Sequence, residues 1–175
     1  MIIKRLLLTV VIFISVSAHG QETKKDFIIS SGAYVSSLYN SSGYYFSIES
    51  TWKNNLNFSL KTAFTDSDDY EGLHTLMGVN WVLVPFSKID DSFFNTESYL
   101  GFYPLSVEKF THNTDDDEIE NAFAPSIFIG YKLIFWSKLV LDMYAGGNVA
   151  LRLGDSEKES TYSNKTAGIG IGIKF

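Results

Sequence analysis

Two histidines of this 175-residue chain, His74 and His112, are the side chains best suited to act as general bases. Nucleophilic catalysis needs a serine or threonine within reach of the base and a third group that orients it. Asp66 and Ser67 lie in the predicted loop before the strand of His74, which falls on the polar face of that strand. The spacing therefore allows a triad around His74, and the alternative is a hydrogen-bonded histidine inside the protein.

Acidic residues are the next candidates, because hard cations bind several carboxylate oxygens. Asn113, Asp115 and Asp117 have the opening spacing of a calcium-binding loop but lack the glycine that makes its turn. Asp66 and Asp68 form a weaker pattern, and solvated loops are the alternative for both sets. The chain has no cysteine, which excludes disulfides and thiolate-bound zinc. The sequence predicts no metal and no cofactor.

The N-terminal segment has the order of a secretory signal peptide. Two basic residues precede an apolar run over 6–14, and small residues follow it up to Gly20. The run is shorter than the roughly 20 residues of a membrane-spanning helix. Cleavage after Ala18 or Gly20 is expected, and the second choice gives a signal peptide at 1–20 and one domain at 21–175. The loss of two cations changes the formal net charge from −6 to −8, so no nucleic-acid partner is predicted.

The rest of the chain is a succession of segments in which apolar and polar side chains alternate. A period of two between turn residues predicts β-strands. Several segments exceed the five or six residues usual in soluble proteins, and about 9–11 residues cross a membrane as a tilted strand. The eight predicted strands span 27–39, 43–52, 56–65, 73–85, 97–109, 122–135, 138–153 and 165–175.

The connections between these strands alternate in length and charge. The longer, acidic ones at 66–72, 111–121 and 154–164 follow odd-numbered strands, and a short turn such as 136–137 follows an even-numbered strand. Outer-membrane barrels have short periplasmic turns and longer external loops. The parity therefore predicts a membrane barrel with both termini in the periplasm, although the even-numbered connection at 86–96 is long.

Charged side chains fall on the less apolar face of the predicted strands. A Lys or Arg that faces lipid at the middle of the membrane costs roughly 2–4 kcal/mol, so a membrane barrel must turn its charges inward. Eight strands enclose room only for packed side chains, and buried charges need partners. We therefore expect a paired polar network in the lumen, formed by Glu49, Lys61, Lys132, Asp142, Arg152 and Lys174.

Some features qualify this pattern. Alternation is blurred in the first and fifth strands, and a β-bulge at Pro104 would explain both the proline and the slipped alternation of the fifth. A soluble lipocalin-like barrel also alternates, with its apolar face inward. The membrane is favoured by two expected aromatic girdles. Trp52, Trp81 and Trp136 would form the periplasmic girdle, and Tyr39, Tyr44, Tyr45 and Phe110 the outer one.

The last strand carries Ile171, Ile173 and Phe175 on one face. With the signal peptide, eight strands and loop parity, the chain resembles the small outer-membrane β-barrels of Gram-negative bacteria, such as the OmpX-like proteins and the transmembrane domain of OmpA. This architectural resemblance covers the whole mature chain. It implies an all-β, eight-stranded antiparallel up-and-down transmembrane barrel in the outer membrane. It also implies that Ile171, Ile173 and Phe175 are recognised by the barrel-assembly machinery.

The predicted function is a non-enzymatic one, in which a monomeric barrel supports the envelope and binds partners through acidic external loops. Membrane lipid and lipopolysaccharide are the expected partners, with a cationic molecule or bridging divalent ions at the loops. One alternative is a lipid A-modifying enzyme that uses His74 or His112, although neither has the His-x-Ser pair of the lipid A deacylase barrels. The other alternative is a soluble lipocalin-like carrier.

Overall fold

The computed structural model describes most of the predicted barrel domain. The predicted signal peptide at 1–20 and the acidic residues Asp115 and Asp117 lie outside the described part of the chain. No helix in the described part is long and apolar enough to cross a membrane. The described residues are 26–37, 41–53, 55–66, 70–86, 94–112, 119–153 and 161–175.

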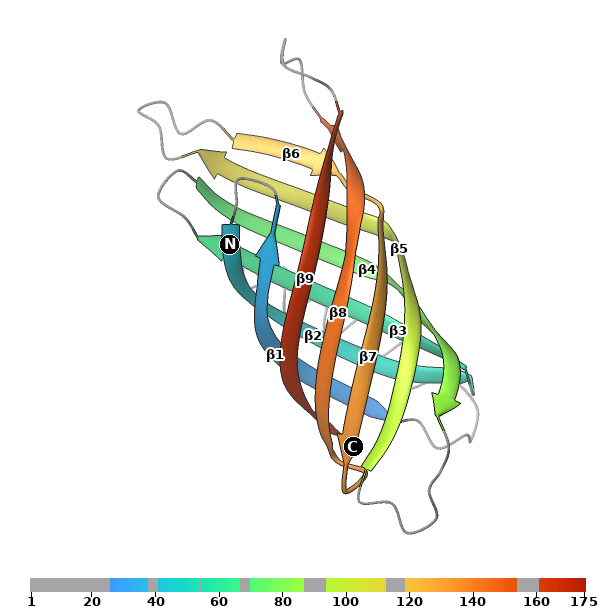
Figure 1. The fold of residues 1–175 in the computed structure, drawn as a ribbon. Coiled ribbons are helices and arrows are strands. Elements are labelled where there is room, and N and C mark those ends of the chain that lie inside the picture. The colour runs from blue at the N-terminus through green and yellow to red at the C-terminus, as the bar shows by residue number, and fades with distance from the viewer. Residues whose placement is uncertain are drawn as a thin grey trace.

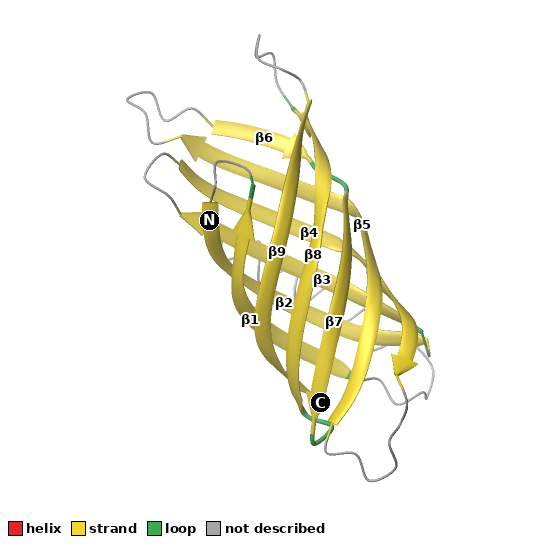
Figure 2. Cartoon of the chain, viewed as in Figure 1, coloured by secondary structure: helices red, strands yellow, loops and turns green. Residues whose placement is uncertain are grey.

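The described residues form β-strands joined by turns and short irregular segments (Figure 2). The strands are long, as expected for segments that cross a membrane at a tilt. They are β1 (Phe27–Ser36), β2 (Ser41–Lys53), β3 (Leu56–Asp66), β4 (Tyr70–Phe86), β5 (Phe94–His112), β6 (Ile119–Phe123), β7 (Ser126–Phe135), β8 (Leu139–Arg152) and β9 (Thr161–Lys174).

The strands pair antiparallel in chain order, and β1 also pairs with β9, so the sheet closes into a barrel (Figure 1). Phe27 and Phe175 meet at one end, where the Phe175 N–H donates to the Phe27 carbonyl at 2.8 Å. We call this the inner end, and we call the opposite end, which carries β6, the outer end. Closure satisfies the backbone hydrogen bonds without water, which a wall in lipid requires.

β6 and β7 share one position in the wall, because both pair with β5 on one side and β8 on the other. The wall therefore has eight strand positions, which confirms the predicted eight-stranded up-and-down fold. The strand predicted over 122–135 is not continuous, however. It is interrupted at Ala124 and Pro125, since a proline cannot donate to a ladder, and its outer part begins at Ile119.

The predicted bulge in the fifth strand is confirmed. Met77 pairs with Leu105 and Val79 with Phe102, so two steps along β4 match three steps along β5. The extra residue lies at Pro104, which has no N–H to contribute to the ladder. As a result, the inward positions of β5 change from odd to even numbers beyond the bulge, and Ser106 and Glu108 turn inward.

The two faces of the wall differ in chemistry. Large apolar side chains such as Ile129 and Ile171 are 59% and 63% exposed on the outside, whereas Glu49, Lys132 and Asp142 are almost completely buried inside. A soluble barrel has the reverse distribution, so this structure argues against the lipocalin-like alternative. The outward face is that of a membrane-spanning barrel.

The predicted aromatic girdles are partly corrected. Trp52, Trp81 and Trp136 are exposed. Tyr45 and Phe110, in contrast, are buried inside the barrel. Tyr45 shares the inward parity of Ser47 and Glu49 on β2, and the bulge turns Phe110 inward on β5. Among the described residues predicted for the outer girdle, Tyr44 alone is exposed; Tyr39 lies outside the described part of the chain.

Glycines of β9 leave space for aromatic rings that point into the lumen. A Cβ on Gly168 would lie 2.5 Å from the Tyr144 ring, and a Cβ on Gly170 would overlap the Tyr45 hydroxyl. Both glycines have inward parity, between the lipid-facing side chains of the same strand. The glycine alternation of the last strand is therefore a packing feature.

Candidate functional site

Four charged side chains meet inside the barrel, and we call them the charge centre. Glu49, Lys61, Lys132 and Asp142 project from β2, β3, β7 and β8 and are each 1–3% exposed. The wall order places β2 and β7 on opposite sides of the barrel. Lys132 Nζ donates to Glu49 Oε2 at 2.5 Å, so this ion pair crosses the lumen.

Lys132 also lies beside acidic residues on both neighbouring strands. The register places it directly opposite Glu97 on β5 and Asp142 on β8. The Tyr99 hydroxyl donates to Asp142 Oδ1 at 3.0 Å. The charges are thus arranged with opposite signs next to one another, which is the condition for burying them.

The second cation of the charge centre is enclosed by aromatic rings. Lys61 Nζ lies 3.4 Å from the centroid of the Tyr144 ring and 4.8 Å from that of Tyr45. These two rings meet edge to face at 5.3 Å, and Phe128 packs against Tyr144 at 5.4 Å. Such cation–π contacts strengthen where water is excluded. Together with the charge centre, the rings fill this section of the narrow lumen.

The other two residues of the predicted lumen network lie elsewhere. Lys174 forms an ion pair with Asp26 at 2.9 Å, and both side chains are partly exposed at the inner end. Arg152 lies near the outer end of β8, 5.6 Å from the centroid of the Tyr162 ring. The predicted six residues therefore do not form one network. Lys174 and Arg152 lie at opposite ends of long strands, so neither side chain is at the level of the charge centre.

A second polar cluster lies nearer the outer end. His74 Nε2 and Ser106 Oγ are 2.6 Å apart, and His74 Nδ1 lies 3.3 Å from Glu108 Oε1. Glu108 also accepts hydrogen bonds from Asn148 Nδ2 and the Tyr162 hydroxyl, each at 2.6 Å. The carboxylate is thereby held in place beside the imidazole. We call Ser106, His74 and Glu108 the serine cluster.

The serine cluster has the order of a nucleophile, a general base and an orienting carboxylate. With the proton on Nδ1 directed at Glu108, the Nε2 atom of His74 would accept the hydroxyl proton of Ser106. Ser106 is fully buried, and Ser126 Oγ lies 3.3 Å from its hydroxyl oxygen. The same geometry is also that of a chain of hydrogen bonds between side chains that point into the lumen.

The wall beside Ser106 departs from a regular ladder. The pairing of β5 with β7 ends at the pair Tyr103–Ser126. The pairing of β5 with β6 begins at the pair Val107–Phe123. Between these pairs, the Ala124 N–H donates to the Ser106 carbonyl at 2.8 Å. Pro104 of β5 and Pro125, in the break between β6 and β7, have no N–H to contribute. β-Bulges are over-represented next to active sites.

The partners of His74 differ from those that the sequence suggested. Ser106 and Glu108 occupy the positions proposed for Ser67 and Asp66. Sequence reasoning missed them because the bulge reverses the parity of β5, and a one-residue slip after Pro104 was the signal that could have found them. The side chain of His112, like Ser67, lies outside the described part of the chain.

Within the described residues, no three His, Cys, Asp or Glu side chains gather in a metal-binding arrangement. The acidic pattern at 113–117, which the sequence singled out, lies outside those residues. The described side chains of the site are therefore the charge centre and the serine cluster.

Solved structures of outer-membrane β-barrels are similar to this chain in fold. The N-terminal β-barrel domain of Pseudomonas aeruginosa OprF matches 89% of this chain and 100% of its own, with 16% identity and a TM-score of 0.61. Neisserial surface protein A matches 86% of this chain and 96% of its own, with 16% identity and a TM-score of 0.59. These similarities establish the fold and agree with the predicted outer-membrane location.

The outer membrane enzyme PagL is also similar, with 11% identity and a TM-score of 0.51 over 83% of this chain and 98% of its own. No protein-family model matches the chain, and no curated protein matches it significantly. The fold is therefore compatible with an enzyme. The activity of this chain has to be inferred from its own residues, because the comparisons do not assign one.

The charge centre predicts a specific stability pattern. Lys132→Met leaves Glu49 buried without its closest cation, which should lower the free energy of unfolding by about 3–5 kcal/mol. The double variant Glu49→Met/Lys132→Met should recover most of this loss, because apolar side chains of similar volume replace a buried pair at little cost. Urea unfolding in lipid vesicles measures both values.

Lys138→Met is the matched control, because Lys138 is exposed in the turn at the inner end. It should change the free energy of unfolding by no more than about 0.5 kcal/mol. Equal effects of Lys132→Met and Lys138→Met would show that the pair across the lumen contributes nothing specific.

Proposed function

We propose that this chain is a small outer-membrane β-barrel with a sealed interior, whose task beyond supporting the envelope is carried by its external loops. The observation that carries this proposal is the Lys132–Glu49 ion pair across the lumen, beside the rings that surround Lys61. A lumen filled in this way has no room for a water-filled channel. The rigid wall then serves as a scaffold for the loops.

The loops at 66–72, 111–121 and 154–164 are polar and mostly acidic in sequence. A cationic partner, or divalent ions that bridge to lipopolysaccharide, is the ligand that suits this chemistry. A monomer is supported by the closed wall, because pairing of every described strand on both sides leaves no edge for a second copy.

We also propose that the barrel-assembly machinery recognises the lipid-facing side of β9. Ile171, Ile173 and Phe175 are 63%, 52% and 69% exposed there. These side chains form a continuous apolar ridge on the strand that closes the barrel against β1.

The serine cluster supports a second candidate function, a hydrolase for acyl esters of membrane lipids. In this reaction Ser106 Oγ attacks the ester carbonyl while its proton passes to His74 Nε2, and that proton then leaves with the alcohol. Water, deprotonated by His74, releases the fatty acid and restores Ser106. The irregular wall at Pro104 and Pro125 is the route by which a lipid would approach, and PagL supports the compatibility of the fold with an enzyme.

The sealed barrel is tested by conductance in planar lipid bilayers. We expect no stable channel openings from the wild-type protein, because the charge centre closes the lumen. Glu49→Ala/Lys132→Ala should raise the frequency of brief openings. Steady openings of the wild-type protein, of the size of a water-filled pore, would refute the sealed interior.

Recognition by the assembly machinery is tested with Ile173→Asp, which places a charge on the ridge. The variant should be exported normally but should lose most of its folded, heat-modifiable form in outer-membrane fractions. Ser163→Asp is the control, since Ser163 is exposed on the same face near the outer end of β9. Equal folded levels of both variants would contradict the proposal.

The second candidate is tested with a fluorophosphonate probe on the detergent-solubilised protein. The hydrolase predicts labelling of Ser106 that disappears in Ser106→Ala and falls at least tenfold in His74→Gln, whereas Ser126→Ala keeps its label. It also predicts an acyl-chain difference in lipid A from cells that express the protein. The absence of labelling would reject the hydrolase and leave the sealed scaffold.

A further inference from the structure

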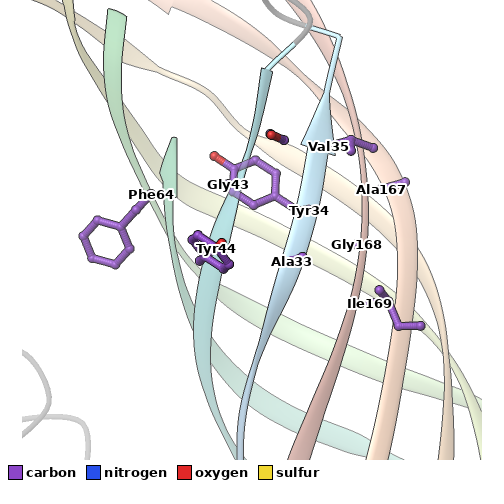
Figure 3. Close-up of a pocket in the computed structure, with 10 residues that line it drawn as sticks. Ala33, Tyr34, Val35, Gly43, Tyr44, Phe64, Ala167, Gly168 and Ile169 are labelled. Atoms are coloured by element: carbon purple, nitrogen blue, oxygen red, sulfur yellow. The ribbon is translucent and has the colours of Figure 1, made fainter. Parts of the chain in front are cut away.

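The lipid-facing side of the barrel has a hollow of about 750 Å³ over β1, β2 and β9, with Phe64 of β3 at its edge (Figure 3). The register places Ala33 between Tyr44 of β2 and Ile169 of β9, and it places Val35 opposite Ala167. Small alanine side chains therefore lie between larger ones at neighbouring lipid-facing positions. The volume of the hollow is within the range of roughly 300–1,000 Å³ that is typical of ligand clefts.

The wall behind this hollow is closed. Tyr34 points inward from β1, is buried, and has its hydroxyl hydrogen-bonded to Thr65 of β3. Its ring lies against Gly43, where an added Cβ would come within 2.9 Å of it. The Tyr34 ring therefore lies on the lumen side of the wall, behind the outward side chains that line the hollow.

A cation lies at the outer end of the hollow. Lys165 precedes Ala167 by two residues on β9, on the side of the outer end. It has the same lipid-facing parity and is exposed. Its backbone is held by Ser37, because its N–H donates to Ser37 Oγ and its carbonyl accepts from the Ser37 N–H, each at 2.8 Å. None of the ion pairs among the described residues includes Lys165.

The height of Lys165 matches the surface of the membrane. Ten residues separate it from Phe175 at the inner end, which is about 33 Å of strand. At a tilt of about 40° this corresponds to roughly 25 Å across the membrane, the height of the apolar band of such barrels. The hollow thus opens toward the outer leaflet, with Lys165 at its boundary.

We propose that this hollow binds lipid A, the phosphorylated and acylated base of lipopolysaccharide, directly from the outer leaflet. An acyl chain lies over Ala33 and Ala167 between Tyr44 and Ile169, and a phosphate pairs with Lys165. In this proposal the outer surface of the barrel wall contacts lipopolysaccharide directly. This contact is additional to the one that divalent ions at the external loops would bridge. A second copy of the chain suits the hollow less well, because a two-fold interface brings the two Lys165 side chains together.

The test places a photo-crosslinking amino acid at Val35, on the rim of the hollow, in cells. Ile129 is the matched control, because the two side chains are 58% and 59% exposed on lipid-facing surfaces of different strands. We expect a lipopolysaccharide adduct that is several-fold stronger from position 35. Equal adducts from both positions, or phospholipid adducts alone, would overturn the proposal, and so would an adduct with the mass of two copies.

Charge variants in the Val35 crosslinking background test the role of Lys165. Lys165→Glu should reduce the adduct about fivefold or more, since one basic residue near an anionic surface contributes about 1 kcal/mol. Lys165→Arg and the inner-turn control Lys138→Glu should retain it. Heat-modifiable mobility verifies folding of each variant. Unchanged crosslinking of a folded Lys165→Glu variant would exclude a phosphate at this position.

Discussion

The constraint on which this structure depends is that a wall in lipid must satisfy its backbone hydrogen bonds without water. The β1–β9 pairing closes the ladder, and closure fixes an interior too narrow for anything but side chains. Period-two alternation then assigns each residue either to lipid or to the lumen. Inward charges in so narrow an interior need partners of opposite sign, and Lys132 reaches Glu49 from the opposite wall.

The wall departs from a regular ladder near the serine cluster. Pro104 adds a residue to β5, and Pro125 helps to interrupt the next position of the wall. Each proline removes one hydrogen-bond donor, a cost that a membrane barrel must offset with neighbouring contacts. The Ala124 N–H does so in part by donating to the carbonyl of Ser106. The interrupted ladder and the serine cluster therefore lie together.

Much of the fold follows from the sequence, because alternation and turn chemistry are local properties. The inward parity of Glu49, Lys61, Lys132 and Asp142 is set by their own strands, and it was predictable. Which residues meet across the lumen depends on strand tilt and stagger, which no local pattern encodes. Lys174 therefore pairs with Asp26 at the inner end and lies outside the charge centre. Glu108 was hidden because its parity depends on the bulge.

The alternation of side chains along each strand also separates the lumen surface of the wall from its lipid-facing surface. Consecutive residues of a strand therefore contact different surroundings. On β9, Asn164 accepts a hydrogen bond from Ser36 on the inside at 2.7 Å, while Lys165 faces outward. Gly168 leaves space for Tyr144 in the lumen, and Ala167 forms part of the hollow on the lipid side. A change among the inward side chains therefore need not alter the lipid-facing surface. Lipid binding outside the wall is compatible with either role proposed for the inside, because the hollow uses the outward face of the wall, whereas the charge centre and the serine cluster use its inward face.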